Sequence, residues 1–446
     1  MASLARRLGP RAVQVLTSAG TRAARRSLAE WGRRLRGAPH RVLYFHQVDD
    51  PYSQLAAQLL RPLVERYDVA LVPHLAGPPS DAAAPERERL AAFARKDAAD
   101  VAPGYGLAFP PGAPAPDAGL AELAARILAA APAPEAFAAL APRVGDALWR
   151  GEPSALEALA REHGAADAAA AREAAAAGSR LRERHGHYLG ATFHYAGEWY
   201  WGADRLDHLE RRLAALGARR AGARGDGPIA ARPGVSAERV PAAAGERLAL
   251  EFYASLRSPY TWLAVDRVFA LPRRYPVDLV LRPVLPMVMR GLPVPRAKRL
   301  YITLDAKREA EDAGVPFGRV CDPVGRPVER CFSLYPFACE RGRGAELLRS
   351  CLSAAFAEGI DLGTDAGLRV AAERAGLAWP EARERLDREG WRAPLERNRE
   401  QLFALGLWGV PSFRLLGRAG EPDFCTWGQD RLWLVEREIR RRLERG

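Results

Sequence analysis

Residues 248–286 read LALEFYASLRSPYTWLAVDRVFALPRRYPVDLVLRPVLP, a sequence in which two apolar runs flank a helical stretch. The helical stretch follows a Ser-Pro-Tyr turn and carries apolar residues every three to four positions, whereas the flanking runs are short and rich in Val, Leu and Phe. A strand, a helix and a second strand in this order predict a right-handed crossover between two parallel strands. We therefore expect a βαβ unit at the start of the second half of the chain.

The same pattern occurs earlier in the chain, where residues 41–77 read RVLYFHQVDDPYSQLAAQLLRPLVERYDVALVPHLAG. The later parts of the two halves match as well. Residues 190–217 read GATFHYAGEWYWGADRLDHLERRLAALG, and residues 409–443 read GVPSFRLLGRAGEPDFCTWGQDRLWLVEREIRRRL. Each reads as two strands followed by a helix that opens at Trp-Gly-x-Asp-Arg-Leu. The sequence thus predicts an α/β fold of two tandem domains, each built as βαβ, a helical insertion and ββα.

A chain of 446 residues exceeds the size at which a single hydrophobic core usually stops growing, which also favours two domains. We expect a basic N-terminal arm or helix at residues 1–40, a first domain at 41–217, a linker at 218–246 and a second domain at 247–446. The expected linker is rich in Gly, Pro, Ala and Arg and lacks apolar periodicity. The repeat also suggests that the two halves pack as an internal pseudo-dimer.

The overall charge is strongly positive, with a formal net charge of +12 and a pI near 9.8. The arginines are spread along helical surfaces, and no nucleic-acid-binding motif is present, so we expect no nucleic-acid partner. No apolar run approaches the roughly 18 residues that indicate a membrane span. We expect no transmembrane segment, and a small molecule is the favoured partner.

The first 40 residues carry nine arginines and no acid other than Glu30. This pattern is compatible with an amphipathic helix on an anionic surface. A solvated basic arm or a short helix packed on the body of the protein is the favoured interpretation, and an organelle transit peptide is a further alternative. An apolar central run of the kind found in secretory signals is absent.

All five cysteines lie in the second half of the chain, and no two are spaced as Cys-x-x-Cys. A thiol-disulfide enzyme needs a second thiol beside its nucleophile, and zinc sites show close ligand pairs. Histidines 46, 74, 163 and 185 also have no partners at ligand spacing. We therefore expect free thiols in a reducing cytoplasm, and no metal site.

The turn at residues 257–264, RSPYTWLA, places Ser258 at a helix N-cap, Pro259 at the first helical position and Tyr260 just inside the helix. Ser and Pro are common at these positions for structural reasons alone. A functional interpretation is also open, because the positive end of a helix stabilises an anion that lies against the serine hydroxyl.

Two segments near the end of the chain are further candidates. In LWGVPSF (407–413), a proline stands at the first residue of an expected strand. In TWGQDRLWLVEREI (426–439), Gln429 and Asp430 lie at the start of the final helix, where an acid suits the helix dipole and where a ligand carboxylate could also bind.

These segments together resemble the 2-hydroxychromene-2-carboxylate isomerases and the kappa-class glutathione transferases, in the DsbA-like branch of the thioredoxin superfamily. EFYASLRSPYTWLA (251–264) is similar to the family's start, and PRAKRLY (295–301) to the segment after its second strand. GVPSF (409–413) is similar to the family's cis-proline strand, and WGQDRL (427–432) to the start of its γ-glutamyl-binding helix.

The resemblance implies a glutathione-dependent isomerase or transferase acting on an unsaturated aromatic carboxylate. Ser258 matches the catalytic serine, at the helix start where thioredoxin-like proteins keep a reactive cysteine, so the thiolate comes from outside the chain. Lys298 matches a lysine near the substrate carboxylate. A cis Val410–Pro411 bond would leave the Val410 backbone free to pair with an extended peptide. The implied cofactor-binding residues are Pro259, Tyr260, Val410, Pro411, Gln429 and Asp430.

Two departures from the family pattern concern the pockets. The stretch VLPMVMRGLPV (284–294) is shorter than in the family and lacks an asparagine that helps kappa-class members to bind glutathione. In the first half, Asp50 stands in place of the serine and Ala191 in place of the proline, whereas Asp204 and Arg205 are retained. A carboxylate opposes a neighbouring thiolate, so we expect the first domain to be a degenerate copy.

Two alternatives to the isomerase or transferase stay open. One is a DsbA-like protein without Cys-x-x-Cys that acts as a non-catalytic peptide-binding or thiol-binding module. The other is a thiol-disulfide oxidoreductase, which the absence of a cysteine pair argues against.

Overall fold

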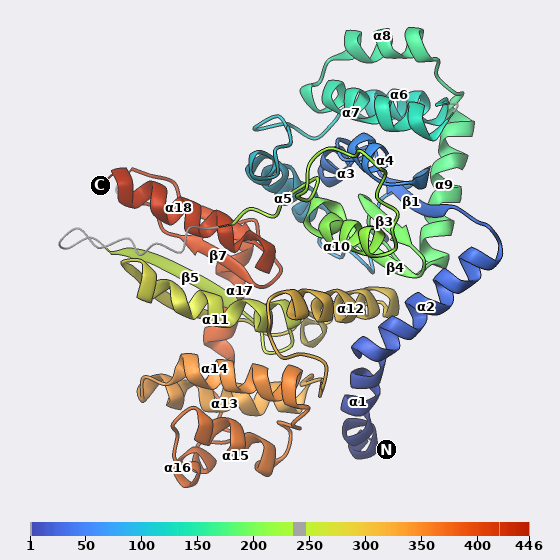
Figure 1. The fold of residues 1–446 in the computed structure, drawn as a ribbon. Helices are drawn as coiled ribbons and strands as arrows, with labels where there is room; N and C mark the ends of the chain where they lie inside the picture. Colours follow the sequence, from blue (N-terminus) through green and yellow to red (C-terminus); the bar gives the residue numbers. More distant parts are fainter. Residues whose placement is uncertain (1, 132, 235–246, 419, 446) are drawn as a thin grey trace. The chain divides into compact units, whose positions relative to one another are not determined.

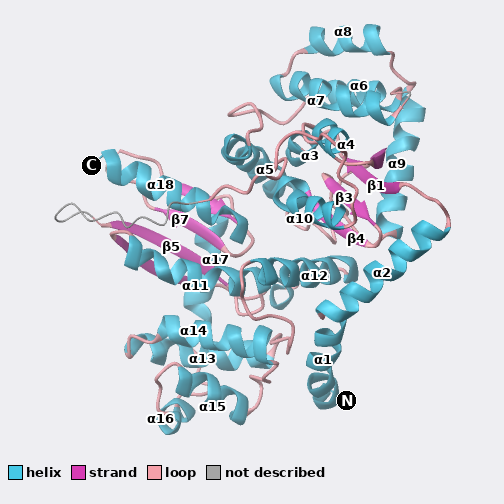
Figure 2. Cartoon of the chain, in the orientation of Figure 1, coloured by secondary structure: helices cyan, strands magenta, loops and turns pink. Residues whose placement is uncertain are grey.

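The structure is a computed structural model that describes residues 2–131, 133–234, 247–418 and 420–445. The chain divides into two compact units (Figure 1). The N-terminal unit is Ala24–Gly234, and the C-terminal unit is Val235–Gly446 together with Met1–Ala23. Each unit contains one four-stranded mixed sheet with its own helices, shown by the two groups of strands in Figure 2. The predicted α/β fold class is therefore confirmed.

The C-terminal unit has the strand order β6-β5-β7-β8. Its strands are β5 (Leu248–Ala254), β6 (Val277–Pro283), β7 (Ser412–Leu415) and β8 (Phe424–Trp427). β5 and β6 are parallel and are joined by helix α11 (Pro259–Arg274), whereas β7 and β8 are antiparallel neighbours on the other side of β5. The predicted βαβ and ββα parts thus form one sheet.

The helices of the C-terminal unit lie mainly between β6 and β7. They are α1 (Ala2–Thr17), η2 (Met287–Arg290), α12 (Arg296–Asp312), α13 (Arg326–Glu340), α14 (Gly344–Ser353), η3 (Ala354–Glu358), α15 (Asp365–Arg374), α16 (Trp379–Glu384), α17 (Arg392–Ala404), η4 (Gln429–Arg431) and α18 (Leu432–Arg445). The core forms where the central strands meet these helices. Phe252 and Phe413, opposite each other on β5 and β7, are fully buried and stack at 5.4 Å between ring centroids.

The N-terminal unit has the strand order β2-β1-β3-β4, with the same parallel and antiparallel neighbours. Its strands are β1 (His40–His46), β2 (Val69–Leu75), β3 (Thr192–Tyr195) and β4 (Glu198–Trp201). The helices are α2 (Ala19–Leu35, which begins in the other unit), α3 (Pro51–Ala57), α4 (Leu60–Arg66), α5 (Arg87–Val101), η1 (Ala102–Tyr105), α6 (Ala118–Ala129), α7 (Pro134–Arg150), α8 (Pro153–His163), α9 (Ala168–Arg184) and α10 (Gly202–Ala215).

Individual side-chain pairs recur in the two units. In the N-terminal unit, the Tyr52 hydroxyl donates to Asp97 at 2.8 Å. In the C-terminal unit, the Tyr260 hydroxyl donates to Asp305, also at 2.8 Å. Both tyrosines follow the proline that begins the crossover helix, and both aspartates lie 45 residues further along. The internal repeat therefore extends to specific buried contacts.

A second pair recurs on the last helix of each unit. The Tyr67 hydroxyl donates to Glu210 of α10 at 3.3 Å, and the Tyr275 hydroxyl donates to Glu436 of α18 at 3.1 Å. Each tyrosine follows the crossover helix, so the bond joins that region to the final helix in both units. The correspondence indicates that the two units share more than the order of their strands.

The two segments expected to lie outside the domains are partly folded onto them. Most of residues 2–35 form helices α1 and α2, of which α1 packs against α12 in the C-terminal unit. Of the linker expected at 218–246, residues 218–234 belong to the N-terminal unit, where the Ile229 N–H donates to both Glu210 carboxylate oxygens at 3.1 and 2.9 Å. Residues 235–246 lie outside the described part of the chain.

Candidate functional site

Ser258 lies at the start of α11, directly after the turn that follows β5. Its hydroxyl oxygen accepts a hydrogen bond from the Thr261 N–H at 3.1 Å, as a helix N-cap does. The same hydroxyl donates to the Val410 carbonyl at 3.3 Å. Only 9% of the residue is exposed. The serine is therefore buried at the helix end and faces the segment that contains Val410 and Pro411.

The Val410–Pro411 peptide bond is cis, as predicted. The bond lies directly before β7, and the Pro411 carbonyl accepts from the Gly428 N–H at 2.9 Å, which ties this segment to the end of β8. Val410 is partly exposed, and its N–H donates to no group among the described residues. That N–H is a donor available to a ligand backbone.

Two tryptophans support the segment before the cis bond. Trp408 and Trp427 pack with ring centroids 5.2 Å apart. A Cβ atom at Gly409 would lie 2.1 Å from the Trp427 ring, so only glycine allows this close approach. Sequence reasoning did not identify Trp408 or Gly409 as site residues, although both lie inside the LWGVPSF stretch that it singled out.

Lys298 lies on the first turn of α12, and its ammonium nitrogen is 5.7 Å from the centroid of the Trp408 ring. A cation at this distance from an indole face is attracted by the ring quadrupole. Burial lowers the pKa of Lys298 to about 8, because desolvation penalises its charged form. The structure thus places Lys298 beside the segment that Ser258 faces.

A hydrogen bond from Tyr260 helps to position α12. The Tyr260 hydroxyl donates to the buried Asp305 carboxylate, which also accepts from Arg308 at 2.8 Å. This pair links the first turn of α11 to the middle of α12, the helix that carries Lys298. The hydroxyl of Tyr260 is thus engaged within the protein. Asp305 is a positioning residue that no sequence motif indicated.

Gln429 and Asp430 lie in η4, a short 3₁₀ turn before α18, rather than in the first turn of the final α-helix. The Gln429 side chain is buried, accepts from Arg267 of α11 and donates to Glu309 of α12 at 3.1 Å and to Asp430. Its amide therefore holds two helices and the turn together. Asp430 is partly exposed. The ligand-binding roles expected of both residues stay predictions.

An ion-pair cluster centred on the buried Glu251 joins three neighbouring strands of the same sheet. Glu251 of β5 accepts from Arg282 of β6 at 2.9 Å and from Arg414 of β7 at 3.2 Å, and the Tyr253 hydroxyl donates to it at 2.9 Å. Burial alone would raise the pKa of Glu251, but the hydrogen bonds from Arg282, Tyr253 and Arg414 outweigh burial and lower it. These contacts lock the register of three strands.

The corresponding helix start in the N-terminal unit is occupied by a carboxylate of the chain itself. Asp50 caps α3, accepting from the Ser53 N–H at 3.0 Å and from the Ser53 hydroxyl at 2.8 Å. Burial raises the pKa of Asp50 to about 6, against the hydrogen bonds from Ser53 that lower it. A Cβ atom at Gly190 would lie 3.1 Å from Asp50, so the backbone closes tightly over this carboxylate.

One backbone hydrogen bond of the other unit recurs in this region, although the backbone conformation at the matching residue differs. Ala191, at the place of Pro411, has a positive φ of 55°, and its carbonyl accepts from the Gly202 N–H at 2.7 Å. Asp204, at the place of Asp430, is buried and accepts from the Tyr105 hydroxyl at 2.6 Å. The polar groups here are thus bonded to one another.

The cysteines show no arrangement typical of a redox site. Cys321, Cys331 and Cys351 are buried, Cys425 is partly buried, Cys339 is exposed, and all five are free thiols. Hydrogen bonding to Cys351, together with burial, raises the pKa of Cys331 well above its usual range. A thiol with a raised pKa is a poor nucleophile at neutral pH.

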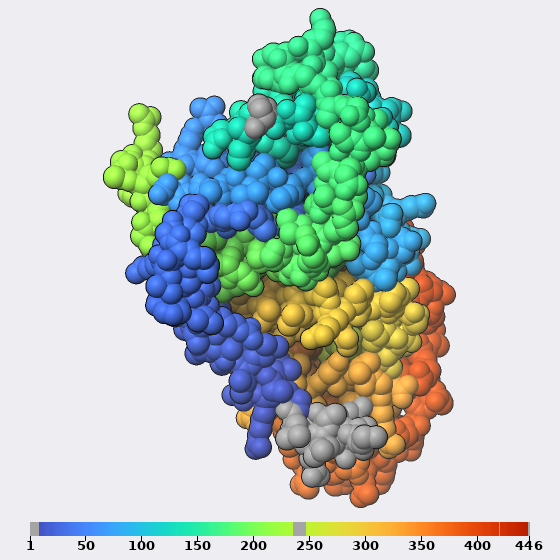
Figure 3. All heavy atoms as spheres, turned by 90° about the vertical axis from the view of Figure 1, so that its right-hand side faces the viewer, coloured from blue at the N-terminus to red at the C-terminus, as the bar shows by residue number. Residues whose placement is uncertain are grey.

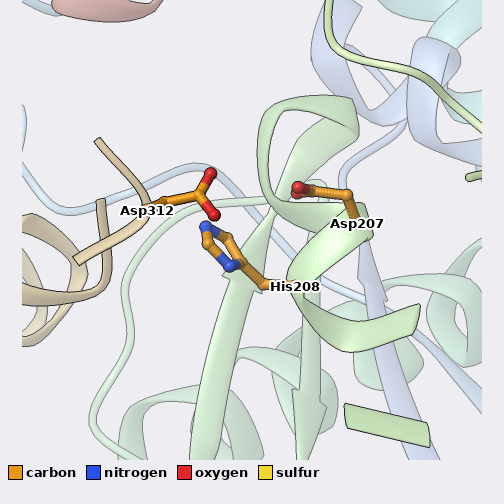
Figure 4. A group of neighbouring side chains, drawn as sticks. All are labelled: Asp207, His208 and Asp312. Carbon is orange, nitrogen blue, oxygen red and sulfur yellow. The ribbon is translucent and has the colours of Figure 1, made fainter. Parts of the chain in front are cut away.

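Three residues have side chains of the kinds that bind metal ions. Figure 4 shows Asp207 and His208, consecutive residues of α10 in the N-terminal unit, together with Asp312. Asp312 belongs to the C-terminal unit, so the three residues do not form a site within either unit. Asp207 also accepts from Arg232 at 3.0 Å. We assign no metal site to this group.

Comparison with known proteins supports the fold of the second half. The family model of the DsbA-like thioredoxin domain matches residues 249–440, which therefore have a DsbA-like thioredoxin fold. No curated protein matches the chain. None of the described helices combines the length and the apolar character needed to cross a bilayer.

Solved structures similar to the chain include an isomerase and a disulfide reductase. The structure of 2-hydroxychromene-2-carboxylate isomerase is 22% identical, with 43% of this chain and 95% of that chain covered and a TM-score of 0.35. Cytosolic disulfide reductase DsbM from Pseudomonas aeruginosa is 24% identical, with 44% and 100% covered and a TM-score of 0.35. A second DsbM structure, with GSH, is 22% identical, with 43% and 100% covered and a TM-score of 0.32.

Proposed function

We propose that the C-terminal unit is a glutathione-dependent isomerase or transferase acting on an unsaturated aromatic carboxylate. The observation that carries this proposal is the position of the Ser258 hydroxyl, at the N-terminus of α11 and 3.3 Å from the Val410 carbonyl. A hydroxyl at the positive end of a helix favours an anion such as a thiolate, and hydrogen bonding to the charged form lowers a thiol pKa. The chain has no cysteine at this position, so the thiol must come from a bound molecule.

Bound glutathione would supply a sulfur nucleophile that adds reversibly to the substrate double bond and allows rotation about it, with no net redox change. Ser258 would orient that sulfur, the Val410 backbone would pair with the tripeptide, and Asp430 would face its ammonium group. The residues fit these roles because the Val410 N–H has no partner among the described residues and Asp430 is partly exposed.

The Ser258 hydroxyl already donates to Val410, so an incoming anion must compete for its hydrogen. At 3.3 Å this bond is longer than the usual 2.5–3.0 Å of O–H···O hydrogen bonds. A hydrogen bond to an ionised acceptor is roughly twice as strong as one between neutral groups. The exchange therefore favours the anion, and the released Val410 carbonyl can accept an N–H from the ligand backbone. Both acceptors end up satisfied.

Lys298 is proposed to bind the substrate carboxylate, and its titration gives a pH prediction. Because burial lowers its pKa to about 8, Lys298 carries its charge below that pH and loses it as the pH rises above it. The KM for a carboxylate substrate should therefore rise between pH 7 and pH 9, by about fivefold if the ion pair contributes on the order of 1.4 kcal/mol.

Steady-state kinetics of the wild type and two variants checks this prediction. Lys298→Arg keeps its charge over the whole range and should abolish the rise in KM, whereas Lys298→Met should have a high KM at every pH. An unchanged pH profile in Lys298→Met would assign the titration to another group.

Calorimetry of ligand binding and an assay of substrate turnover together test the proposed function. The protein should bind glutathione at millimolar concentration or tighter, and S-methylglutathione, which has no ionisable thiol, should bind more weakly above neutral pH. The bound protein should then isomerise 2-hydroxychromene-2-carboxylate. Binding without turnover of any electrophilic aromatic substrate would indicate the non-catalytic module instead, and absence of binding would refute the glutathione site.

A further inference from the structure

The helix α2 presents a row of large apolar side chains to solvent. Leu28, Trp31 and Leu35 are 68%, 62% and 66% exposed. Their spacing of three and four residues places them on one face of the helix. Scattered single apolar residues are common on protein surfaces, but a contiguous row that includes a tryptophan marks an interaction surface. We call this row the apolar stripe of α2, and Figure 3 shows the helix, in dark blue, at the molecular surface.

The opposite face of α2 holds the helix on the N-terminal unit. Arg26 donates to both carboxylate oxygens of Glu198 at 2.7 Å. Arg33 donates to the Ala38 carbonyl at 2.7 Å, which fixes the end of the helix before β1. Because these contacts set the rotation of the helix about its axis, the apolar stripe is held outward by the fold itself.

Positive charge borders the apolar stripe. Arg25 and Arg36 are exposed and form no ion pair with any described residue. Glu30 accepts from both Arg33 and Arg34. The hydrogen bonds from these arginines lower the pKa of Glu30 to about 2, so Glu30 stays ionised at neutral pH. Its negative charge is balanced by the two arginines of the same helix. No other acid occurs in the first 40 residues, so the bordering surface is positive overall.

We propose that α2 docks the protein on the surface of an anionic lipid bilayer. An apolar stripe bordered by arginines, with tryptophan among its residues, suits the boundary between head groups and acyl chains, where apolar side chains insert and guanidinium groups meet lipid phosphates. The charge is complementary to anionic lipid, and none of the described helices spans a bilayer, so the attachment is peripheral. This surface is independent of the glutathione site.

Co-sedimentation of the full chain with vesicles tests the proposal. The protein should pellet with phosphatidylcholine vesicles that contain phosphatidylglycerol, stay soluble with phosphatidylcholine alone, and be released by salt. The Leu28→Ser/Trp31→Ser variant should bind at least about tenfold more weakly, since each of these side chains would be buried in the bilayer. The Arg25→Ser/Arg36→Ser variant should bind roughly 25-fold more weakly, since each arginine near an anionic surface contributes about fivefold in affinity.

A matched control changes two exposed leucines elsewhere. Leu300 and Leu304 are 41% and 37% exposed, and Leu300→Ser/Leu304→Ser should bind vesicles like the wild type. Circular dichroism checks that every variant is folded. Vesicle binding that is unchanged in the α2 variants would overturn the proposal. So would sedimentation velocity without lipid that shows a dimer abolished by Leu28→Ser/Trp31→Ser, because the stripe would then bind a second copy.

Discussion

The Ser258→Ala variant is expected to lose about 100-fold to 1,000-fold in kcat/KM for the glutathione-dependent reaction, the usual cost of removing one preorganised donor to a developing anion. The hydroxyl is the side-chain donor that the structure places between the start of α11 and the Val410 carbonyl. The pKa of the bound glutathione thiol should rise in the variant, which thiolate absorbance against pH measures directly.

The same change also removes a helix cap, which costs about 1 kcal/mol of stability on its own. Thr364 provides the matched control, because its hydroxyl caps α15 by accepting from the Gly367 N–H at 3.0 Å. Thr364→Ala should lose similar stability and keep full activity. If both variants retain wild-type turnover and the same thiol pKa, Ser258 is only a cap and the proposed mechanism is wrong.

The Glu251→Ala variant is expected to lose about 3 kcal/mol of stability, because it leaves two arginines on the sheet without their shared carboxylate. Arg282 and Arg414 are partly exposed, which keeps the cost at the lower end of the range for broken buried pairs. For a unit of this size the loss corresponds to a fall in melting temperature of roughly 6–12 °C. Scanning calorimetry of the full chain measures it.

Asp278 on β6 offers a control of the same chemistry in a different environment. Its ion pair with Arg247 is largely exposed, so Asp278→Ala should cost at most about 1 kcal/mol of stability.

The contribution of Glu251 to stability depends on pH with a definite sign. Because the pKa of Glu251 is lowered in the folded protein, its stabilisation is present above pH 4.5, the ordinary pKa, and is lost as the pH falls further. Equal melting temperatures for Glu251→Ala and Asp278→Ala would contradict the assigned role.

The parts of the fold that the sequence predicted are those specified by local patterns. The strands of both βαβ units follow from short apolar runs, and the N-cap at Ser258 follows from its Ser-Pro dipeptide. The same reasoning applied to residues 41–77 finds β1, α3 and β2, although the chain forms a second short helix, α4, before β2. Local patterns do not fix where a helix is interrupted.

The parts that the sequence could not predict depend on contacts between distant residues. The Tyr260–Asp305 bond helps to fix α12, which carries Lys298, against α11, and no motif reports that bond. Glu251 breaks the apolar pattern of β5, and its two arginine partners become apparent only when the strands pair. Residues 218–234 of the expected linker belong to the N-terminal unit, and the contact of Ile229 with Glu210 that ties them to it is not encoded locally.

The two units share a sheet order but carry different residues at the start of the crossover helix. The Asp50 carboxylate lies at the start of α3, at the place where the C-terminal unit has the Ser258 hydroxyl. A carboxylate there repels a bound thiolate. The hydrogen bond between Tyr52 and Asp97, by contrast, matches the one between Tyr260 and Asp305 in the other unit. The expectation of a degenerate first copy therefore has a physical basis, and the pseudo-dimer stays a prediction.

A crystal structure of the protein with glutathione bound tests the central claim most directly. We predict that the sulfur lies within hydrogen-bond distance of the Ser258 hydroxyl, with the tripeptide backbone paired to Val410 and the ammonium group facing Asp430. A sulfur bound elsewhere, with Ser258 still donating to the Val410 carbonyl, would contradict the account.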